Sequence, residues 1–190
     1  MRKIATLYLF LLLACSCSGK LRTKGLPMAR MATMDIPALT FLPQPVAASL
    51  DVEVQNLGSV YRFQAQVEMD REALVMVGLA PIGSSAFTLT YRGDQVTYEH
   101  IPFFNLPLKP DRLLLAYLLL ALPEKDLENH VQKFGFSLEQ NIGETKLLFD
   151  QTPIARVISK NGSIKGGEVV FHHLHQGYLL RIKTLQWETY

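Results

Sequence analysis

Ten consecutive residues without a charge, from Leu113 to Leu122, constrain the fold of this chain more than any other segment. No helix-breaking residue interrupts the run, and Pro123 follows it, so the pattern predicts a helix over residues 112–122. A helix that is apolar on all sides must be covered on nearly all of them. Ten residues cover only about half of a bilayer core, so this helix cannot span a membrane. The run therefore predicts a helix that is enclosed by the rest of the protein.

The segments on both sides of this helix have the two-residue period of antiparallel strands. From Tyr61 to Asp70 apolar and polar residues alternate, which predicts a strand with one buried and one wet face. A short polar helix is predicted over residues 124–132. Further strands, separated by short turns, are predicted at residues 50–56, 73–80, 86–91, 95–100, 134–141, 144–150, 154–159, 168–175 and 178–188. The predicted fold is mainly β (α+β), with about ten antiparallel strands in an open bowl around one helix.

The N-terminus has the three parts of an export signal and ends in a cysteine. Arg2 and Lys3 precede an apolar stretch over residues 4–14, which is too short to span a bilayer. The four residues Leu12-Leu13-Ala14-Cys15 resemble the lipobox of bacterial lipoproteins, in which the cysteine thiol becomes a diacylglyceryl thioether. We therefore expect a signal peptide over residues 1–14 and membrane attachment through lipid on Cys15. The alternative is an ordinary secretory signal with an incidental cysteine.

The residues after Cys15 predict a tether followed by one domain. Residues 16–48 contain four prolines and show no sustained period, which indicates an acylated cysteine with a flexible lead-in over residues 15–48. Residues 49–190 are then enough for a single domain with its own core. Ser16 is not the aspartate that retains many enterobacterial lipoproteins in the inner membrane, so resemblance to that rule favours the outer membrane.

Composition argues against several classes of function. Without Arg2 and Lys3 the 19 basic residues become 17, equal to the 17 acidic ones, and no basic cluster indicates a nucleic-acid partner. Both cysteines lie at the export junction, so no disulfide is expected in the domain. His173 and His175 have the spacing of metal ligands on a strand, but they lack companions, and we expect solvated or packed histidines with no metal and no cofactor. Gly83-Ser84-Ser85 is not a nucleophile elbow, so no catalytic residue and no enzyme activity are expected.

Several short motifs resemble a known family in the same order along the chain. They are Leu79-Ala80-Pro81-Ile82-Gly83, Leu106-Pro107-Leu108 before Asp111-Arg112-Leu113-Leu114, Leu120-Ala121-Leu122-Pro123 and Gly177-Tyr178-Leu179-Leu180-Arg181-Ile182. The stretch from Phe63 to the C-terminus resembles a family of bacterial lipoproteins of unassigned function that are often encoded beside genes for aryl-polyene pigments. It is more distantly similar to LolB, the outer-membrane receptor that takes lipoproteins from the periplasmic carrier LolA.

The resemblance implies an antiparallel sheet curled into an open half-barrel, lidded by helices, whose apolar concave face holds acyl chains. The residues that would line this cavity are Phe63, Val67, Met69, Phe87, Leu89, Tyr98, Leu114 and Leu118. Their periodicity alone favours a solid core, because any β domain needs an apolar inner face, and only the resemblance favours a cavity. Ile82 matches the leucine of a LolB hairpin that serves membrane insertion, which implies a membrane-inserting tip; the alternative is that Ile82 folds back on the core.

These observations lead to two functional hypotheses. The first is a non-enzymatic lipoprotein of the outer membrane that binds acyl chains and helps deliver lipoproteins or lipidated products, such as aryl-polyene lipids, with a LolA-like carrier as a partner. The second is an accessory lipoprotein of a cell-envelope complex, whose domain is a solid module without a ligand.

Overall fold

The structure is a computed structural model that describes residues 17–80, 83–102, 104, 106–159 and 164–190. Cys15 and Ile82 lie outside the described residues, so the roles predicted for these two positions stay predictions.

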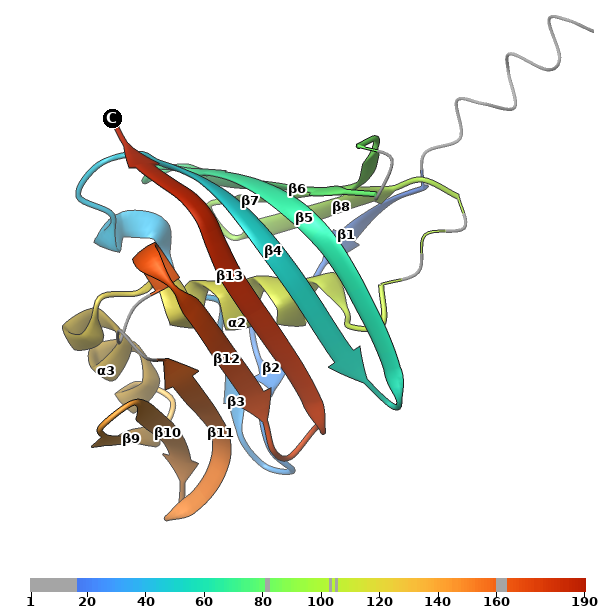
Figure 1. The fold of residues 1–190 in the computed structure, drawn as a ribbon. Coiled ribbons are helices and arrows are strands. Elements are labelled where there is room, and N and C mark those ends of the chain that lie inside the picture. Colours follow the sequence, from blue (N-terminus) through green and yellow to red (C-terminus); the bar gives the residue numbers. More distant parts are fainter. Residues whose placement is uncertain (1–16, 81–82, 103, 105, 160–163) are drawn as a thin grey trace, which may run out of the picture.

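One antiparallel sheet of 11 strands makes up most of the fold (Figure 1). Its strands are β1 (Cys17–Leu21), β4 (Val46–Asn56), β5 (Ser59–Met69), β6 (Ala73–Leu79), β7 (Ser85–Arg92), β8 (Gln95–His100), β9 (Phe136–Asn141), β10 (Glu144–Phe149), β11 (Thr152–Ser159), β12 (Glu168–His173) and β13 (Tyr178–Thr189). Their order in the sheet is β1-β8-β7-β6-β5-β4-β13-β12-β11-β10-β9, so β13 pairs with β4 and joins two runs of hairpins. The edge strands β1 and β9 do not pair in the described structure, and the sheet curls without closing into a barrel.

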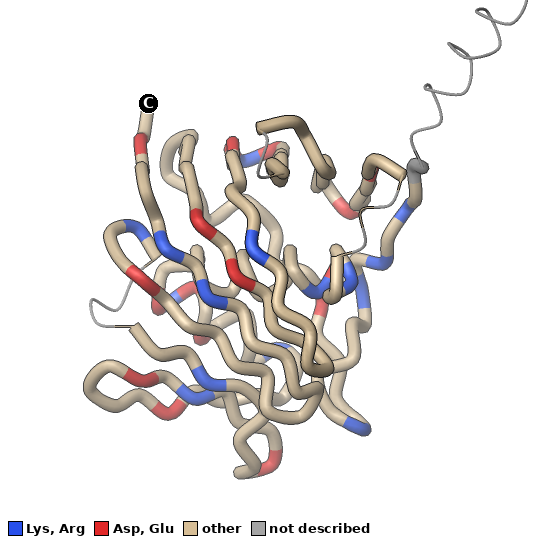
Figure 2. The backbone as a smooth tube through the Cα atoms, turned by 45° about the vertical axis from the view of Figure 1, so that its right-hand side comes forward, with Lys and Arg blue, Asp and Glu red and all other residues tan. Residues whose placement is uncertain are grey.

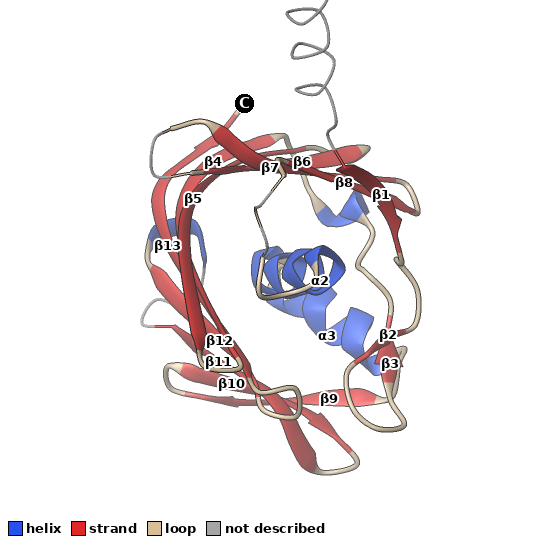
Figure 3. Cartoon of the chain, turned by 90° about the vertical axis from the view of Figure 1, so that its right-hand side faces the viewer, coloured by secondary structure: helices blue, strands red, loops and turns tan. Residues whose placement is uncertain are grey.

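Two helices connect the halves of the sheet, α2 (Pro110–Ala121) and α3 (Glu124–Gln132), and a 3-10 turn, η2 (Ile164–Gly166), precedes β12. Viewed along the strands, α2 lies inside the curve of the sheet (Figure 3). Its residues from Leu113 to Leu119 are all buried. The predictions of a mainly β antiparallel fold and of an enclosed apolar helix are therefore confirmed. Within the described residues no helix has the length and apolar character needed to cross a membrane.

The segment before β4 is folded, contrary to the predicted flexible lead-in. β1 adds to the sheet edge at β8, and a small hairpin of β2 (Leu26–Pro27) and β3 (Thr33–Met34) is followed by the 3-10 turn η1 (Leu39–Phe41). We call residues 22–45 the N-terminal strap. Its buried apolar side chains are Leu26, Met28, Ala32, Met34, Ile36, Leu39 and Leu42. The expectation of a tether that extends to residue 48 is thus wrong for residues 17–45.

Hydrogen bonds fasten the strap to four distant parts of the domain. Thr23 Oγ1 donates to the carbonyl oxygen of Asp94 (2.8 Å), and Arg71 Nε donates to that of Leu42 (2.7 Å). The ring Nε2 of His130 on α3 lies 3.0 Å from the carbonyl oxygen of Asp35, and Gln176 Nε2 donates to the carbonyl of Pro27. In Figure 3 the strap passes between β1 and β9, on the side that the sheet leaves open. Its apolar residues belong to the same buried core as those of α2, and because the strap has little regular structure, they show no period in the sequence.

Candidate functional site

The eight side chains predicted to line an acyl cavity belong to the core of the domain. Phe63, Val67, Met69, Phe87, Leu89, Leu114 and Leu118 are buried, and Tyr98 is half-buried against them. The ring centroids of Phe63 and Phe87 are 5.3 Å apart, and those of Phe87 and Tyr98 are 5.7 Å apart. Of the eight, Val67 alone lines a cavity that we find between described residues, a space of about 170 Å³ that it shares with polar residues such as Gln66 and Glu188. In this part of the structure α2 and the aromatic side chains fill the concave face.

The ring of Phe87 depends on a glycine in the neighbouring strand. Gly78 pairs with Phe87 across β6 and β7, and a Cβ at Gly78 would lie 2.0 Å from Phe87 Cε1. Phe87 is buried, so its ring cannot move aside without disturbing the core. The absence of a side chain at Gly78 therefore leaves room for the Phe87 ring, which contacts the rings of Phe63, Tyr98 and Phe104.

Replacing Gly78 with alanine should lower the free energy of unfolding by about 1–3 kcal/mol, because overpacking strains a filled core. Urea denaturation would measure the loss. Gly19, also in a strand, is the matched control, since a Cβ there would have no atom within 4 Å. In a Phe87→Leu background the cost of Gly78→Ala should shrink; an unchanged cost would contradict the proposed clash.

A groove lies elsewhere in the fold, between the C-terminal half of α2, helix α3 and strands β9 to β12. Its inner end is a small cavity of about 20 Å³, lined by Leu119, Leu127, Val131, Leu138, Thr145, Leu147, Ala155, Val157 and Phe171. Its outer part has a volume of about 260 Å³ and shares Leu119, Leu127, Thr145 and Val157 with the inner end. The outer part adds Leu120, Leu122, Glu124, Gln140, Asn141, Ser159, Ile164 and Val169. The groove is thus apolar inside and polar at its mouth.

The period of the strands places these side chains on one face. Thr145 on β10 pairs with Val157 on β11, and Val157 pairs with Phe171 on β12. Leu147 and Ala155, two residues further along each strand, point to the same side as Thr145 and Val157. Helix α3 closes the groove with Leu127 and Val131, which are four residues apart and lie on one side of the helix.

One polar atom at the mouth has no hydrogen-bond partner. Ser159 is buried and lines the outer part of the groove, yet its Oγ makes no hydrogen bond in the described structure. A buried hydroxyl without a partner is costly, so Ser159 Oγ is available to a ligand that brings its own polar group. Gln140 and Asn141 supply amide groups at the same mouth, and Glu124 supplies a carboxylate. This arrangement suits a molecule with an apolar chain and a polar head.

Sequence reasoning missed this groove, although part of its signal was present. The strands that form its floor were predicted, and so was the helix over residues 124–132, with the bounds that α3 has. Leu127 and Val131 have the i, i+4 spacing of an apolar stripe on an otherwise polar helix, which indicates a helix that packs on one side only. The sequence did not indicate which strands this stripe would face.

The histidine-rich segment does not form a metal site in the described structure. β12 ends at His173, so His175 lies in the following turn and not on the strand as predicted. His173 is fully buried between the rings of Phe171 and Tyr178, and its Nδ1 accepts a hydrogen bond from the backbone N–H of Gln176 (3.3 Å). Burial lowers the pKa of His173 to about 4, with smaller contributions from His175 and Arg112. Among described residues no group of three or more potential ligands is close enough to hold a metal ion.

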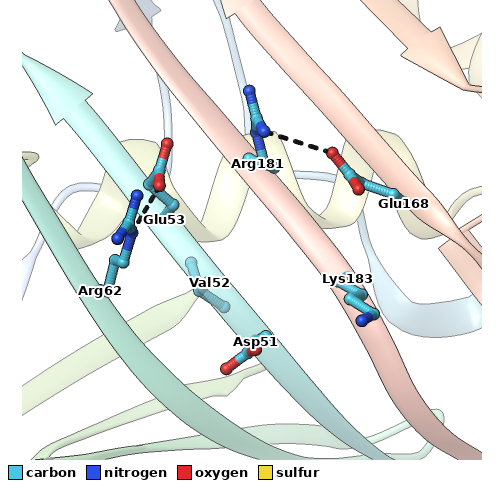
Figure 4. Close-up of a pocket in the computed structure, with 7 residues that line it drawn as sticks. All are labelled: Asp51, Val52, Glu53, Arg62, Glu168, Arg181 and Lys183. Carbon is cyan, nitrogen blue, oxygen red and sulfur yellow. Dashed lines mark hydrogen bonds and ion pairs between the residues drawn. The ribbon is translucent and has the colours of Figure 1, made fainter.

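The outer face of the sheet carries charges of both signs. Figure 2 shows acidic and basic residues interspersed along its strands. A shallow cavity of about 170 Å³ lies among Asp51, Val52, Glu53, Arg62, Glu168, Arg181 and Lys183 (Figure 4). Arg62 Nε is 2.6 Å from Glu53 Oε2, and this hydrogen bond lowers the pKa of Glu53. Arg181 and Glu168 form a longer pair at 3.5 Å. Cross-strand ion pairs at a surface contribute little to stability, and their balanced charges favour no single class of ligand.

Three solved structures are similar to this chain at low sequence identity. A LolA superfamily protein from Nitrosomonas europaea is 8% identical, with 80% of this chain and 90% of that chain covered and a TM-score of 0.43. A DUF1329 family protein from Desulfovibrio piger is 9% identical, with coverages of 77% and 85% and a TM-score of 0.43. A protein domain from Vibrio parahaemolyticus, named for outer membrane lipoprotein sorting, is 7% identical, with coverages of 77% and 85% and a TM-score of 0.42. Scores this low transfer neither a ligand nor an activity.

None of the curated proteins matches the chain. A family model described as "Protein of unknown function (DUF3261)" matches residues 48–186, which is more than half of the sequence. This chain therefore belongs to the DUF3261 family.

Proposed function

We propose that this protein is an outer-membrane lipoprotein that binds an acyl chain in the groove beside α3. It would be attached through lipid on Cys15 and would help deliver lipoproteins or lipidated products to the outer membrane, with aryl-polyene lipids as one candidate cargo. A LolA-like periplasmic carrier would be its donor, and the protein would act by holding and releasing its ligand, without catalysis. The predicted membrane tip at Ile82 belongs to the same proposal.

The chemistry of the groove carries this proposal. Its inner end is lined by aliphatic and aromatic side chains with one threonine, but at about 20 Å³ it holds little more than one water-sized group. The hydrocarbon part of an acyl chain would therefore lie in the outer part, against leucine, isoleucine and valine side chains. Ser159, Gln140 and Asn141 at the mouth suit the ester, amide or carboxyl group at the head of such a chain. At about 260 Å³ the outer part lies just below the range of roughly 300–1,000 Å³ for small-molecule sites. This volume favours one chain over several.

A second function is favoured by the packing around α2. Seven of the eight residues predicted to line an acyl cavity are buried in the core, and Tyr98 is half-buried against it, which suits an accessory module of an envelope complex without a ligand. The two functions differ in whether the groove binds lipid.

Filling the groove should abolish acyl binding and leave the fold intact. Val157 lines both parts of the groove, so Val157→Phe should weaken the binding of a fluorescent fatty acid by about tenfold or more, because the ring takes the place of the chain. Ile158, the next residue on β11, is exposed on the opposite face and provides the matched control. Ile158→Phe should bind as the unaltered protein does.

Lipid extraction and mass spectrometry of the unaltered protein give the second measurement. Acyl species that co-purify with it, and that are lost from Val157→Phe, would support the proposal. No fatty-acid binding and no co-purifying lipid in the unaltered protein would contradict it and would favour the accessory module.

A further inference from the structure

The turn between β4 and β5 exposes three large apolar side chains together. Leu57 is 93% exposed at the tip, and Val60 and Tyr61 at the start of β5 are 53% and 38% exposed. Scattered exposed apolar residues are common on protein surfaces, but a cluster at one projecting tip indicates an interaction site. The tip lies at the lower right of Figure 1, at the end of the long β4–β5 hairpin.

The backbone at this tip makes leucine an unfavourable residue there. Leu57 has φ 48° and Gly58 has φ 81°, and together they form a two-residue turn in which both positions are left-handed. Asn or Gly is preferred at the first position of such a turn, because a larger side chain is strained in this conformation. Leu57 is therefore both strained and exposed to water. Neither property benefits the isolated domain, and strain of this kind is often found at functional sites.

The apolar residues occupy both faces of the hairpin. Tyr61 pairs with Val54, which is buried on the concave side, and Val60 points to the opposite, convex side. The hairpin is held in place by Asn56, whose Nδ2 donates to the carbonyl of Pro107 at 2.6 Å. A protein partner docked on the sheet would cover one of these faces. A bilayer interface can surround both.

The same rim of the sheet carries the N-terminal end of the described chain. Cys17 on β1 pairs with His100 at the end of β8, and through β7 and β6 this position is level with Ala65 on β5. Because β8 is antiparallel to β5, the end of β8 and the start of β5 point to the same end of the sheet. We call this edge the N-terminal rim; it includes the start of β1, the end of β8 and the β4–β5 turn. The rim forms the right-hand side of Figure 1 and faces the viewer in Figure 3. Ile101, directly after β8, is also exposed there.

We propose that the N-terminal rim is the membrane-contacting surface of the domain, and that Leu57, Val60 and Tyr61 enter the bilayer interface. This inference rests on the proposed lipid anchor. One residue, Ser16, separates Cys15 from Cys17, a distance of at most about 7 Å of extended chain, so an acylated Cys15 holds this rim against the membrane. Tyrosine is enriched at membrane interfaces, where its ring is apolar and its hydroxyl reaches water. The domain then has a fixed orientation, with the N-terminal rim against the membrane and no long tether between the anchor and the domain.

The test measures how deeply the tip enters lipid in the full, acylated chain. Leu57→Cys is made in a Cys17→Ser background and labelled with a small fluorophore. The protein is reconstituted in vesicles of phosphatidylethanolamine and phosphatidylglycerol that contain lipids with a nitroxide on the acyl chain. Ile142→Cys is the matched control, because Ile142 is equally exposed at a hairpin tip, between β9 and β10, on the opposite rim. Thermal unfolding verifies that both variants are folded.

The label at position 57 should lose most of its fluorescence to the nitroxide, whereas the label at position 142 should keep it. Equal quenching at both positions, or quenching at 142 alone, would overturn the proposed orientation. Fatty-acid binding is measured on the same labelled proteins. A domain that binds lipid in its groove but leaves position 57 in water would refute this inference alone, and loss of groove binding with position 57 in the bilayer would refute only the proposed function.

Discussion

Replacing Met34 with alanine should lower the free energy of unfolding by about 2–5 kcal/mol, the cost of truncating a large side chain in a filled core. Met34 lies on β3 in the N-terminal strap and is 0% exposed. Its side chain packs in the same core as α2 and the sheet. The loss would show that the strap is an integral part of the domain, and urea denaturation followed by circular dichroism would measure it.

Met31 provides the control within the same hairpin. It is 92% exposed, so Met31→Ala should change the free energy of unfolding by less than about 0.5 kcal/mol. If Met34→Ala lowered the free energy of unfolding as little as Met31→Ala, the strap would be dispensable for stability. The prediction of a flexible lead-in would then be correct.

Stability should fall as the pH drops below about 6.5, and His173 should account for much of the fall. Burial lowers the pKa of His173 in the folded protein to about 4, whereas the unfolded chain titrates near 6.5. Between these values the unfolded state binds a proton that the folded state does not, so lower pH favours unfolding. The stabilisation is complete above pH 6.5 and is lost progressively toward pH 4, by as much as about 3 kcal/mol.

The measurement compares unfolding free energies at about pH 7.5 and about pH 5 in the unaltered protein and in His173→Asn. The asparagine carbonyl can accept the hydrogen bond from Gln176 N–H, but it cannot take up a proton in this range. The variant should be less stable overall and should lose less stability between the two pH values. His130 and His172 also have lowered pKa values and remain in both proteins. Equal pH dependence in the two proteins would therefore assign the effect to those histidines and contradict the role of His173.

The regular elements were predictable because each one has a pattern of its own. The alternation from Tyr61 to Asp70 predicted β5 nearly to its bounds, and the uncharged run from Leu113 to Leu122 predicted α2 as an enclosed helix. These signals are local, since the period of apolar residues depends only on which face of a strand or helix is buried. The strap carried no such signal, because its residues pack through an irregular path fixed by hydrogen bonds to distant carbonyls.

The candidate site was less predictable than the fold. Phe87 and Leu118 face the interior of the domain, as the sequence predicted. Apolar residues on an inner face, however, look the same in the sequence whether they surround a cavity or fill it. The groove beside α3 depends on how Leu127 approaches Val157, two residues that lie on separate elements. The empty space between them results from packing, and no local pattern encodes it.

The sequence by itself determined that this chain forms an antiparallel sheet around one apolar helix, because residue period and the absence of charge decide which faces must be buried. Only the tertiary structure decided where a groove remains between the packed elements and which side of the sheet the strap covers. It also decided that Leu57 lies on the same rim as Cys17. These properties depend on distances between segments that are far apart in the chain, and such distances are set by the packing of the whole domain.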